Sequence, residues 1–569
     1  GVMTWSGATI RNQAAAGTSI QVDAPLTVTG TDAILDTQDA GRGFTFRQNV
    51  LGGGTITTQG GGVLTATTTT TQNLDVVLAG TSGLDKFGAG TLTLGRASTY
   101  SGPTNVAAGV LNLTGSIANS DLNVTAAGTL SGEGAAKSAT FASNSVLVVD
   151  PVTAGAFATT GALTVNATSA SKMTINLTSG PANLDPFTVA TYGSTNATAD
   201  LFSVTGASSY RGTPTIVVGD TALTLQLGFG QLTWTGAVNG TFDNATNNFL
   251  VGPTADRFIY GDVVTFDDTS AVNTVTLAGN LTPTLVNFTN SAQPYTLVSS
   301  TGNTLTGYTK VVKSGTGALV FAGTANNTYT GGTVLSQGSL QFTNLGGAGT
   351  GALTIGDANS GAGDLSVMIT ARPAAGNYLT APIVVAAGTT GAVTIGTTAG
   401  VTGTGTLGFN GVTLNRDVTF LSNGADRTEY SGITGTGNVT FAGANRATVG
   451  NGAANTFTGD VTVTSLAGIG LQVGVATGAA LNGIPDTALV TLNAGTTLAM
   501  SASSETIGNL AGTGTVTTNS FAGTLSIGGK NADATFDGLI TEQTGFALSI
   551  AKVGAGKLTL ATVANAFTG

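Results

Sequence analysis

Apolar and polar residues alternate in short stretches along the whole chain. In Thr91-Leu-Thr-Leu94 and Val110-Leu-Asn-Leu113 every second residue is apolar, which is the pattern of a strand with one buried face. The stretches are separated by Gly and Asn, which favour turns, and the helix formers Glu, Lys and Gln are scarce. The sequence therefore predicts an all-β protein of many short strands.

The apolar positions also recur over a longer distance. Leu92, Leu111 and Leu130 are each 19 residues apart, and Leu319 and Leu340 are 21 apart. A repeat of about 20 residues with two or three strands has the size of one coil of a parallel β-helix. Because crossover connections between parallel strands are right-handed, we predict a right-handed parallel β-helix (β-solenoid). Each coil buries its apolar face against its neighbours, so the molecule is expected to be elongated and a candidate for filament formation.

One motif occurs three times. It reads Lys86-Phe-Gly-Ala-Gly90-Thr-Leu-Thr-Leu94 in the first copy, and an aromatic residue, one further residue and a glycine follow at Tyr100-Ser-Gly102. The motif positions of the three copies are Lys86, Gly88, Gly90, Leu92, Leu94, Tyr100 and Gly102; Lys313, Gly315, Gly317, Leu319, Phe321, Tyr329 and Gly331; and Lys552, Gly554, Gly556, Leu558, Leu560, Phe567 and Gly569. We predict that these residues are structural, with glycines at the corners of the coils and Leu or Phe inside.

A third, longer period groups the coils into modules. Thr4-Trp5-Ser-Gly7 returns as Thr233-Trp234-Thr-Gly236, and Lys86, Lys313 and Lys552 are 227 and 239 residues apart. This spacing predicts three solenoid modules, 1–229, 230–470 and 471–569, stacked continuously, the third being shortened. Because the third copy stops at Gly569, where the second copy continues, we expect the chain to be a segment of something longer.

The amino-acid composition excludes or disfavours several classes of function. Only 8% of residues are charged, and the absence of Cys and His excludes thiol nucleophiles, imidazole bases and zinc sites of the Cys/His type. The 41% hydrophobic content, arranged periodically, argues against disorder. The net charge of −10, with acids scattered singly, disfavours nucleic acid and anionic membrane surfaces. No apolar run approaches the ~20 residues of a membrane span, so we expect no membrane insertion by this segment.

The motif series resembles the autotransporter-associated β-strand repeat. The resemblance rests on Lys86 to Leu94, Tyr100 to Gly102 and Val106-Ala-Ala-Gly109-Val-Leu111-Asn-Leu113. It implies a β-helical passenger region of a bacterial surface protein, extracellular and associated with the outer membrane, in which the repeats form a stalk. It implies no particular ligand, and the family's carboxy-terminal translocator barrel is not present in this sequence.

Glycine-rich stretches give no cofactor site. Gly403-Thr-Gly405-Thr-Leu-Gly408 matches the dinucleotide fingerprint, but no helical pattern follows it, and that site needs a helix N-terminus. Gly529-Lys530 and Gly556-Lys557 lack the Ser or Thr of a phosphate-binding loop. We interpret all three as coil corners and expect no cofactor.

Three charged or aromatic sets have two interpretations each. Asp262, Asp267 and Asp268 are turn residues or calcium ligands; the calcium-binding β-roll nonapeptide is missing, which favours turns and predicts no metal site. The lysines Lys86, Lys313 and Lys552 bind an anionic glycan or, as we prefer, are solvated edge charges that discourage lateral sheet pairing. The aromatic residues Tyr100, Tyr329 and Phe567 lie against corner glycines or the core, or form an exposed ladder for sugars.

The sequence therefore predicts a structural stalk or filament of a bacterial surface, without catalysis. Its expected partners are other copies of itself or continuing repeats of the same chain, with surface glycans as a further candidate. One alternative is an adhesin module that binds glycans or the surfaces of host or neighbouring cells. The other is a polysaccharide-degrading β-helix, which would need carboxylates converging in one groove, and acids are sparse here.

Overall fold

Nearly all regular structure in the computed structural model is β-strand. The single helical element among the described residues is a 3₁₀ turn, η1 (Ala199–Leu201). The structure describes residues 3–5, 8–13, 19–28, 33–37, 43–59, 63–151, 155–178, 186–206, 211, 214–372, 378–388, 391–402, 405–424, 427–450, 453–474, 482–501, 504–561 and 564–569. Within them no helix has the length and apolar content needed to cross a membrane.

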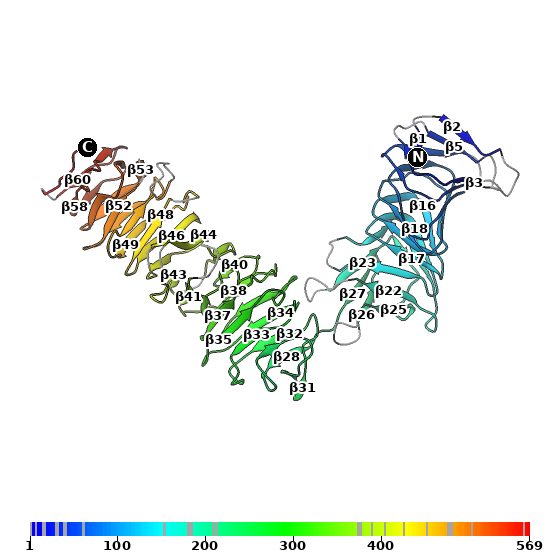
Figure 1. Cartoon of the computed structure of the whole chain (residues 1–569), viewed down its shortest axis with the longest axis horizontal. Coiled ribbons are helices and arrows are strands. Elements are labelled where there is room, and N and C mark those ends of the chain that lie inside the picture. Colours follow the sequence, from blue (N-terminus) through cyan, green and yellow to red (C-terminus); the bar gives the residue numbers. More distant parts are fainter. Residues whose placement is uncertain are drawn as a thin grey trace. The chain divides into compact units, whose positions relative to one another are not determined.

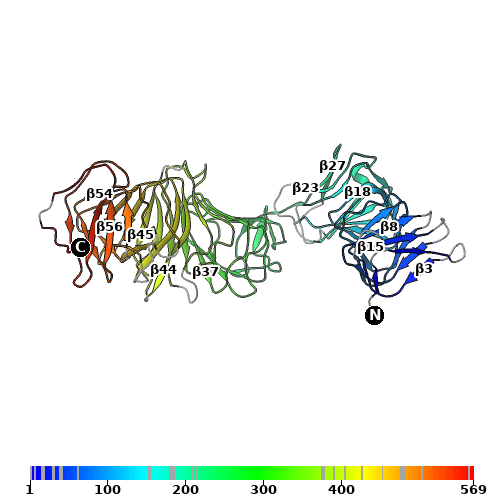
Figure 2. The same cartoon turned by 90° about the horizontal axis from the view of Figure 1, so that it is seen from above.

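The chain divides into two compact units, Gly1–Phe229 and Gly230–Gly569. In each unit, strands from successive coils lie side by side in parallel, as Figures 1 and 2 show. Each unit is therefore a parallel β-solenoid, and the predicted all-β solenoid class is confirmed. The right-handed sense of the coil stays a prediction.

Three sheets form the first unit. Sheet 1 contains, in spatial order, β1 (Met3–Trp5), β4 (Leu26–Val28), β7 (Val50–Leu51), β10 (Thr71–Leu74), β13 (Thr91–Leu94), β15 (Gly109–Leu113), β17 (Gly128–Ser131), β19 (Val146–Val149), β22 (Met173–Leu177) and β25 (Phe202–Thr205). Sheet 2 contains β11 (Val77–Gly80), β8 (Thr55–Gln59), β5 (Ala33–Asp36) and β2 (Ala8–Arg11). Sheet 3 contains β26 (Thr215–Val218), β27 (Ala222–Gln226), β23 (Phe187–Thr191), β20 (Phe157–Thr159), β18 (Ala135–Ala142), β16 (Ser116–Val124), β14 (Thr104–Val106), β12 (Leu84–Phe87), β9 (Leu64–Thr67), β6 (Gly43–Phe46) and β3 (Ser19–Val22), with β21 (Ala162–Asn166) beside β18 and β24 (Ser194–Thr195) beside β21.

Three more sheets form the second unit. Sheet 4 contains β31 (Thr254–Asp256), β30 (Phe249–Val251), β28 (Gln231–Trp234), β32 (Val263–Phe266), β34 (Leu285–Phe288), β36 (Lys310–Lys313), β38 (Thr333–Leu335), β40 (Leu353–Ile355), β42 (Ile383–Val385), β44 (Thr406–Leu414), β46 (Arg427–Gly435), β48 (Arg446–Val449), β50 (Leu471–Val473), β52 (Thr497–Met500), β55 (Thr515–Thr518) and β58 (Leu539–Ile540). Sheet 5 contains β29 (Thr241–Phe242), β33 (Thr274–Leu277), β35 (Tyr295–Ser299), β37 (Ala318–Gly323), β39 (Gly338–Phe342), β41 (Leu365–Ile369), β43 (Val393–Thr397), β45 (Val418–Ser422), β47 (Val439–Ala442), β49 (Val461–Ser465), β51 (Leu489–Leu492), β54 (Asn509–Gly512), β57 (Ala534–Phe536) and β60 (Leu558–Leu560). Sheet 6 contains β53 (Ser504–Ile507), β56 (Gly523–Ile527) and β59 (Leu548–Lys552).

The register follows the predicted coil length. Leu92 pairs with Leu111, which pairs in turn with Leu130, and Leu319 pairs with Leu340. All five side chains are fully buried. Each unit has one continuous apolar core built from such inward-facing rows, because alternation places every second side chain of a strand inside.

Antiparallel strands occur at one end of each unit. In the first unit β27 pairs antiparallel with β23 and β26. In the second unit β30 pairs antiparallel with β28 and β31. Near the predicted module boundary at residue 470, by contrast, β48, β50 and β52 follow one another in parallel in sheet 4. The three sequence modules stay a prediction, while the described structure has two compact units.

Candidate functional site

The lysines of the repeated motif lie at strand ends, next to the corners of the coils. Lys86 is in β12 and Lys313 ends β36, and neither side chain has any exposed surface. Both face inward, because their strands alternate and the residue two positions earlier is also buried. Lys552, the last residue of β59, is exposed.

The buried ammonium groups are held by main-chain carbonyl oxygens. Lys86 Nζ donates to the oxygens of Phe87 at 2.9 Å, Gly88 at 2.8 Å and Ala108 at 3.1 Å. Ala108 lies 22 residues further along, so this cation connects two consecutive coils. All three protons of the ammonium group have an acceptor, which offsets its loss of water.

The lysines of the other two copies also donate to carbonyl oxygens of their corners, and Lys313 in addition reaches the preceding coil. Lys313 Nζ donates to the oxygens of Gly315 and, at 3.3 Å, of Asn290. Lys552 Nζ donates to the oxygens of Val553 and, at 3.0 Å, of Gly554. We call this carbonyl-bound ammonium at Lys86, Lys313 and Lys552 the lysine clamp.

The prediction of solvated edge charges is therefore wrong for Lys86 and Lys313. Charge alone favours an exposed lysine, but the carbonyl groups that the corner turns inward replace water around the ammonium group. Burial lowers the pKa of Lys86, and it lowers the pKa of Lys313 to about 8, against the opposing effect of the Asp268 carboxylate. Burial thus favours the neutral amine, while the carbonyl oxygens favour the charged form.

The glycines of the motif allow the corner to approach the preceding coil. Gly88 has a φ of +81°, a conformation that other residues rarely adopt. A Cβ on Gly90 would lie 1.9 Å from the oxygen of Thr70, and one on Gly556 would lie 2.1 Å from the oxygen of Ala532. A side chain at either position would therefore push two coils apart.

The aromatic residues of the motif are part of the core, as the first of the two interpretations states. Tyr100 and Tyr329 are fully buried, and their hydroxyls lie 2.6 Å from Thr104 Oγ1 and Thr333 Oγ1, respectively. Phe567 is partly buried against the core of the second unit. Burial raises the pKa of Tyr100 to about 12 and also raises the pKa of Tyr329. The alternative of an exposed sugar-binding ladder is wrong for the two tyrosines.

The sequence analysis missed a polar residue two positions before each aromatic. Its side-chain oxygen accepts a hydrogen bond from a main-chain N–H of the preceding coil. The four pairs are Ser98 with Leu78 at 3.0 Å, Asn327 with Leu305 at 2.9 Å, Asn455 with Ile433 at 2.9 Å, and Asn565 with Ile540 at 2.8 Å. The signal was present as the pattern Ser/Asn-x-Tyr/Phe-x-Gly, including a fourth copy at Asn455-Thr-Phe457-Thr-Gly459.

The acidic group of the second unit caps backbone amides. Asp262 is fully buried and accepts hydrogen bonds from the N–H groups of Gly230 at 2.7 Å and Ile259 at 2.9 Å. Asp267 accepts from Thr269, and Asp268 accepts from the N–H of Ser291 at 2.9 Å. These contacts support the turn interpretation. Among the residues that the structure describes, no three acidic side chains come together as a metal site.

The stretch that matches the dinucleotide fingerprint does not lead into a helix. Gly405 precedes the nine-residue strand β44, which confirms a coil corner, whereas Gly403 lies outside the described residues. In Gly529-Lys530, the first of the two glycine-lysine pairs, Lys530 Nζ makes an ion pair with Asp460 at 2.6 Å. Neither stretch has the geometry of a phosphate site.

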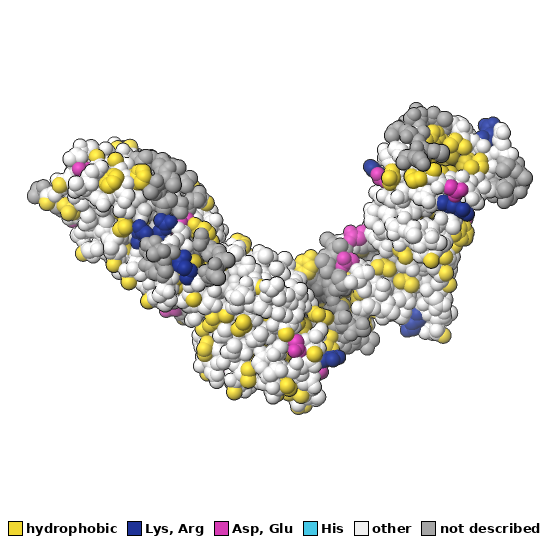
Figure 3. Space-filling model, viewed as in Figure 1, with side chains coloured by type: hydrophobic (Ala, Val, Ile, Leu, Met, Phe, Trp, Pro, Cys, Tyr) yellow, Lys and Arg dark blue, Asp and Glu magenta, His cyan; other side chains and the backbone are white. Residues whose placement is uncertain are grey.

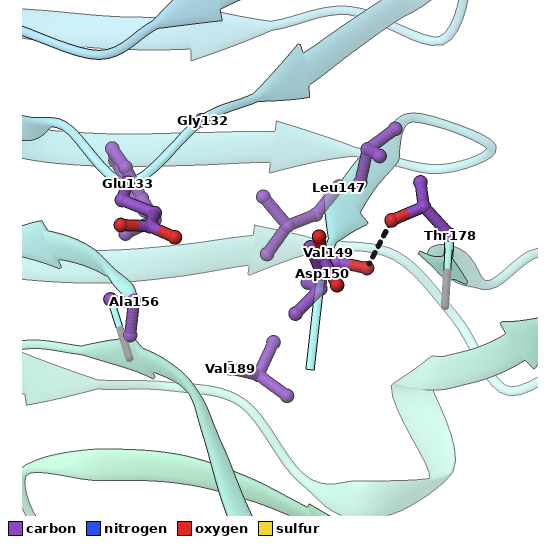
Figure 4. Close-up of a pocket in the computed structure, with 11 residues that line it drawn as sticks. Gly132, Glu133, Leu147, Val149, Asp150, Ala156, Thr178 and Val189 are labelled. Carbon is purple, nitrogen blue, oxygen red and sulfur yellow. Dashed lines mark hydrogen bonds between the residues drawn. The ribbon is translucent and has the colours of Figure 1, made fainter. Parts of the chain in front are cut away.

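A small pocket in the first unit has two carboxylates in its wall. Its volume is about 130 Å³, and Glu133 and Asp150 line it together with Val149, Val189 and Thr178, whose hydroxyl donates to the oxygen of Val149 at 3.4 Å (Figure 4). Pockets for small-molecule ligands usually measure roughly 300–1,000 Å³. On the face seen in Figure 3, charged side chains are few and lie in small groups or pairs on a largely uncharged surface. The prominent recurrent feature of the described structure is thus the corner, not a cleft.

Comparison with known families agrees with this architecture. Three stretches, residues 84–113, 311–342 and 550–569, match the model of the passenger-associated-transport-repeat. The chain carries passenger-type repeats. The matches contain the three lysine clamps and confirm the resemblance drawn from the sequence, while the fourth Asn-x-Phe-x-Gly copy lies outside them. No curated protein and no solved structure matches the chain. Passenger repeats in a β-solenoid indicate a passenger region at the bacterial cell surface.

Proposed function

We propose that this chain is a structural stalk of a bacterial surface protein, which projects or links other parts without catalysis. The proposal rests on one observation, which is what the repeated residues contact. Lys86, Lys313 and the Ser or Asn before each aromatic residue bond the backbone of an adjacent coil. The glycines let the coils approach closely and the tyrosines pack in the core, so the repeated part of the sequence serves stacking. Threonine, serine and asparagine on the outward faces keep such a solenoid hydrated.

The proposal is tested on intact cells of the bacterium that produces the protein. Added protease should release peptides of both units without lysing the cells, because a projecting stalk lies outside the envelope. A cytoplasmic protein of the same cells, followed in the same samples, controls for leakage. Full protection of the chain until the cells are opened would contradict a surface location.

A second candidate, adhesion to neutral glycans, is favoured by one groove of the second unit. The groove has a volume of about 350 Å³ and is lined by Thr497, Thr515, Thr517, Thr541 and Gln543. Its size falls in the range of ligand sites, and hydroxyl and amide groups can bond sugar hydroxyls. Binding of the purified chain to a glycan array, lost in T515A/T517V but kept in T491V, would establish adhesion. An array without any signal would leave the stalk as the sole proposed role.

A further inference from the structure

The threonine-lined groove of the second unit crosses three neighbouring strands of sheet 4. Thr497 and Ala499 lie in β52, Thr515 and Thr517 lie in β55, and Thr541 directly follows β58. Thr497 pairs with Thr515, and Ala499 pairs with Thr517. The floor of the groove therefore repeats the same two positions from coil to coil, at steps of ~4.8 Å.

The walls of the groove stand at opposite ends of these strands. Gly468 and Ile469 come just before β50, the strand next to β52, whereas Asn519 follows β55 and Gln543 comes shortly after β58. Parallel strands all begin on one side of a sheet and end on the other, so the two walls face each other across the floor. The groove therefore runs across the strands, in the direction in which the coils are stacked, for on the order of 10 Å.

The hydroxyl groups on the floor are not used to hold the protein together. Among the described residues, the side-chain hydroxyls of Thr497, Thr515 and Thr541 have no hydrogen-bond partner. Elsewhere on sheet 4, by contrast, the hydroxyl of Thr434 donates to that of Thr413 in the neighbouring coil at 3.2 Å. The groove thus presents a series of hydroxyls that can bond a ligand.

Within the part of the chain that the structure describes, no charged side chain lines the groove. The carboxylate of Glu542, which lies between two lining residues, instead accepts hydrogen bonds from the N–H groups of Leu548 and Thr568, both at 2.9 Å. In the wall, the side-chain amide nitrogens of Asn519 and Gln543 have no acceptor among the described residues. A floor of hydroxyl and methyl groups with two amide donors beside it suits the hydroxyls and C–H faces of neutral sugars.

We propose that the groove binds a linear, neutral polysaccharide whose chain runs along the stacking direction, with consecutive sugar residues on consecutive coils. This inference rests on the second candidate function, adhesion to neutral glycans. A single sugar fills only part of the floor, whereas a chain meets the same hydroxyl and methyl groups at every coil. The step of ~4.8 Å is similar to the length of one sugar residue in an extended chain, so about three residues span the groove.

Isothermal titration calorimetry of the whole chain with β-1,4-linked gluco-, manno- and xylo-oligosaccharides of one to six residues tests the proposal. In at least one series we expect the association constant to rise at least about tenfold from one to three residues and to change less than about threefold beyond three. T515A/T517V should lose the binding. T541V removes a hydroxyl at one end of the floor and should lose most of the gain between two and three residues. T491V, on the outward face of sheet 5, should bind as the unchanged chain does.

Acidic chains are the control for charge. Oligogalacturonates of the same lengths should bind at least about tenfold more weakly, and equal or tighter binding would overturn the proposal. An association constant that does not depend on chain length, or binding that T515A/T517V leaves unchanged, would overturn it too. If no neutral series binds at up to about 10 mM, the proposal is wrong, whereas a glycan-array signal that T515A/T517V abolishes would still support adhesion. Thermal melting of all variants checks that the substitutions leave the second unit folded.

Discussion

At the scale of single residues, the lysine clamp shows how a cation becomes part of an apolar core. Lys86 stands among inward-facing apolar side chains, next to Ala66 and Val106 in the same row. The corner supplies three carbonyl oxygens at 2.8–3.1 Å, so the ammonium group keeps its full set of acceptors. Its removal deprives the Gly88 and Ala108 oxygens of this donor, whereas the Phe87 oxygen still accepts from the N–H of Thr68 at 3.2 Å.

The clamp is tested by substitution at Lys86. K86A removes the hydrogen bonds and leaves a cavity, so we expect a loss of about 2–4 kcal/mol in the free energy of unfolding of the first unit. K86M refills most of the volume and should lose less, about 1–3 kcal/mol. K552A, at the exposed clamp, is the matched control and should change stability by less than about 1 kcal/mol. Denaturant unfolding measures all three, and equal losses for K86A and K552A would contradict the clamp.

The buried carboxyl of Glu505 makes the stability of the second unit depend on pH. Glu505 in β53 is 5% exposed and accepts a hydrogen bond from the N–H of Ile484 at 2.6 Å, and burial raises its pKa to about 8. Between about pH 4.5 and 8 the folded chain keeps a proton that the unfolded chain has lost, so stability falls as pH rises through this window. E505Q stays neutral and should remove this fall, gaining on the order of 2–3 kcal/mol at pH 7.

Glu542 serves as the control, because its contribution to stability changes with pH in the opposite direction. Main-chain N–H groups of Leu548 and Thr568 lower the pKa of the partly exposed Glu542 carboxyl, so its contribution to stability is present above its usual pKa and is lost on acidification. E542Q should therefore be less stable than the unchanged chain at pH 7. Thermal unfolding between pH 4 and pH 8 compares the two variants. A parallel shift of both would contradict the assignment of Glu505.

At the scale of elements, consecutive coils are joined by side chains as well as by strand pairing. Asn327 accepts from the N–H of Leu305 and donates to the oxygen of Gly347 at 2.7 Å, so one amide contacts the coils on both sides. In the first unit Ser98 occupies the corresponding position, and its hydroxyl oxygen accepts a hydrogen bond from the N–H of Leu78 at 3.0 Å. The side chain at this position thus joins neighbouring coils. An asparagine amide can accept and donate at once, so it can contact the coils on both sides.

Substitution of Asn327 tests the bridge. N327A loses both hydrogen bonds and should destabilise the second unit by about 1–3 kcal/mol, because a buried N–H and a buried carbonyl lose their partners. N327S, which copies Ser98, should lose less. N326A, at the exposed neighbour, should be near neutral. Amide hydrogen exchange at Leu305 should accelerate in N327A alone, and unchanged protection there would contradict the bridge.

Strand register could be predicted from the sequence because it depends on side-chain alternation. The 19-residue spacing of Leu92, Leu111 and Leu130 gave their pairing, since a shift by one residue would turn each leucine outward. Lys86 was placed wrongly because its partners are backbone carbonyls, which have no sequence signature. Asn327 was overlooked although its Ser/Asn-x-Tyr/Phe-x-Gly pattern recurs, because the pattern does not reveal that the partner is an N–H of another coil.

The ends of the units could not be predicted from the repeats. The hairpin of β30 and β31 has no counterpart among the repeated motifs, and whether an edge strand is covered depends on segments outside the coil pattern. Trp5 and Trp234 share a motif, yet among the described residues an acceptor for the indole N–H is found for Trp234 and not for Trp5. The local sequence therefore predicts the strand, but not whether another strand pairs with its free edge.

At the scale of the whole molecule, the two units have separate cores. Sheets 1 to 3 contain only strands of Gly1–Phe229, and sheets 4 to 6 contain only strands of Gly230–Gly569. Each core cluster likewise stays within one unit. Each unit should therefore be able to fold without the other.

Separate expression tests this independence. The chains 1–229 and 230–569 should each be folded, with β-type circular dichroism and a cooperative melting transition. Their melting temperatures should agree with two transitions of the full chain to within about 5 °C. A fragment that unfolds on separation would show that the units need each other.

The central claim, that the molecule is a stack of equivalent coils, is tested most directly by removing one coil. Val418 pairs with Val439, so deletion of residues 418–438 removes 21 residues, which is one full turn. Deletion of 418–428 removes about half a turn and misaligns the following strands. Thermal unfolding of residues 230–569 should show a folded unit within about 5 °C of the parent after the first deletion and loss of the cooperative transition after the second. Equal loss of folding in both deletions would contradict the stack.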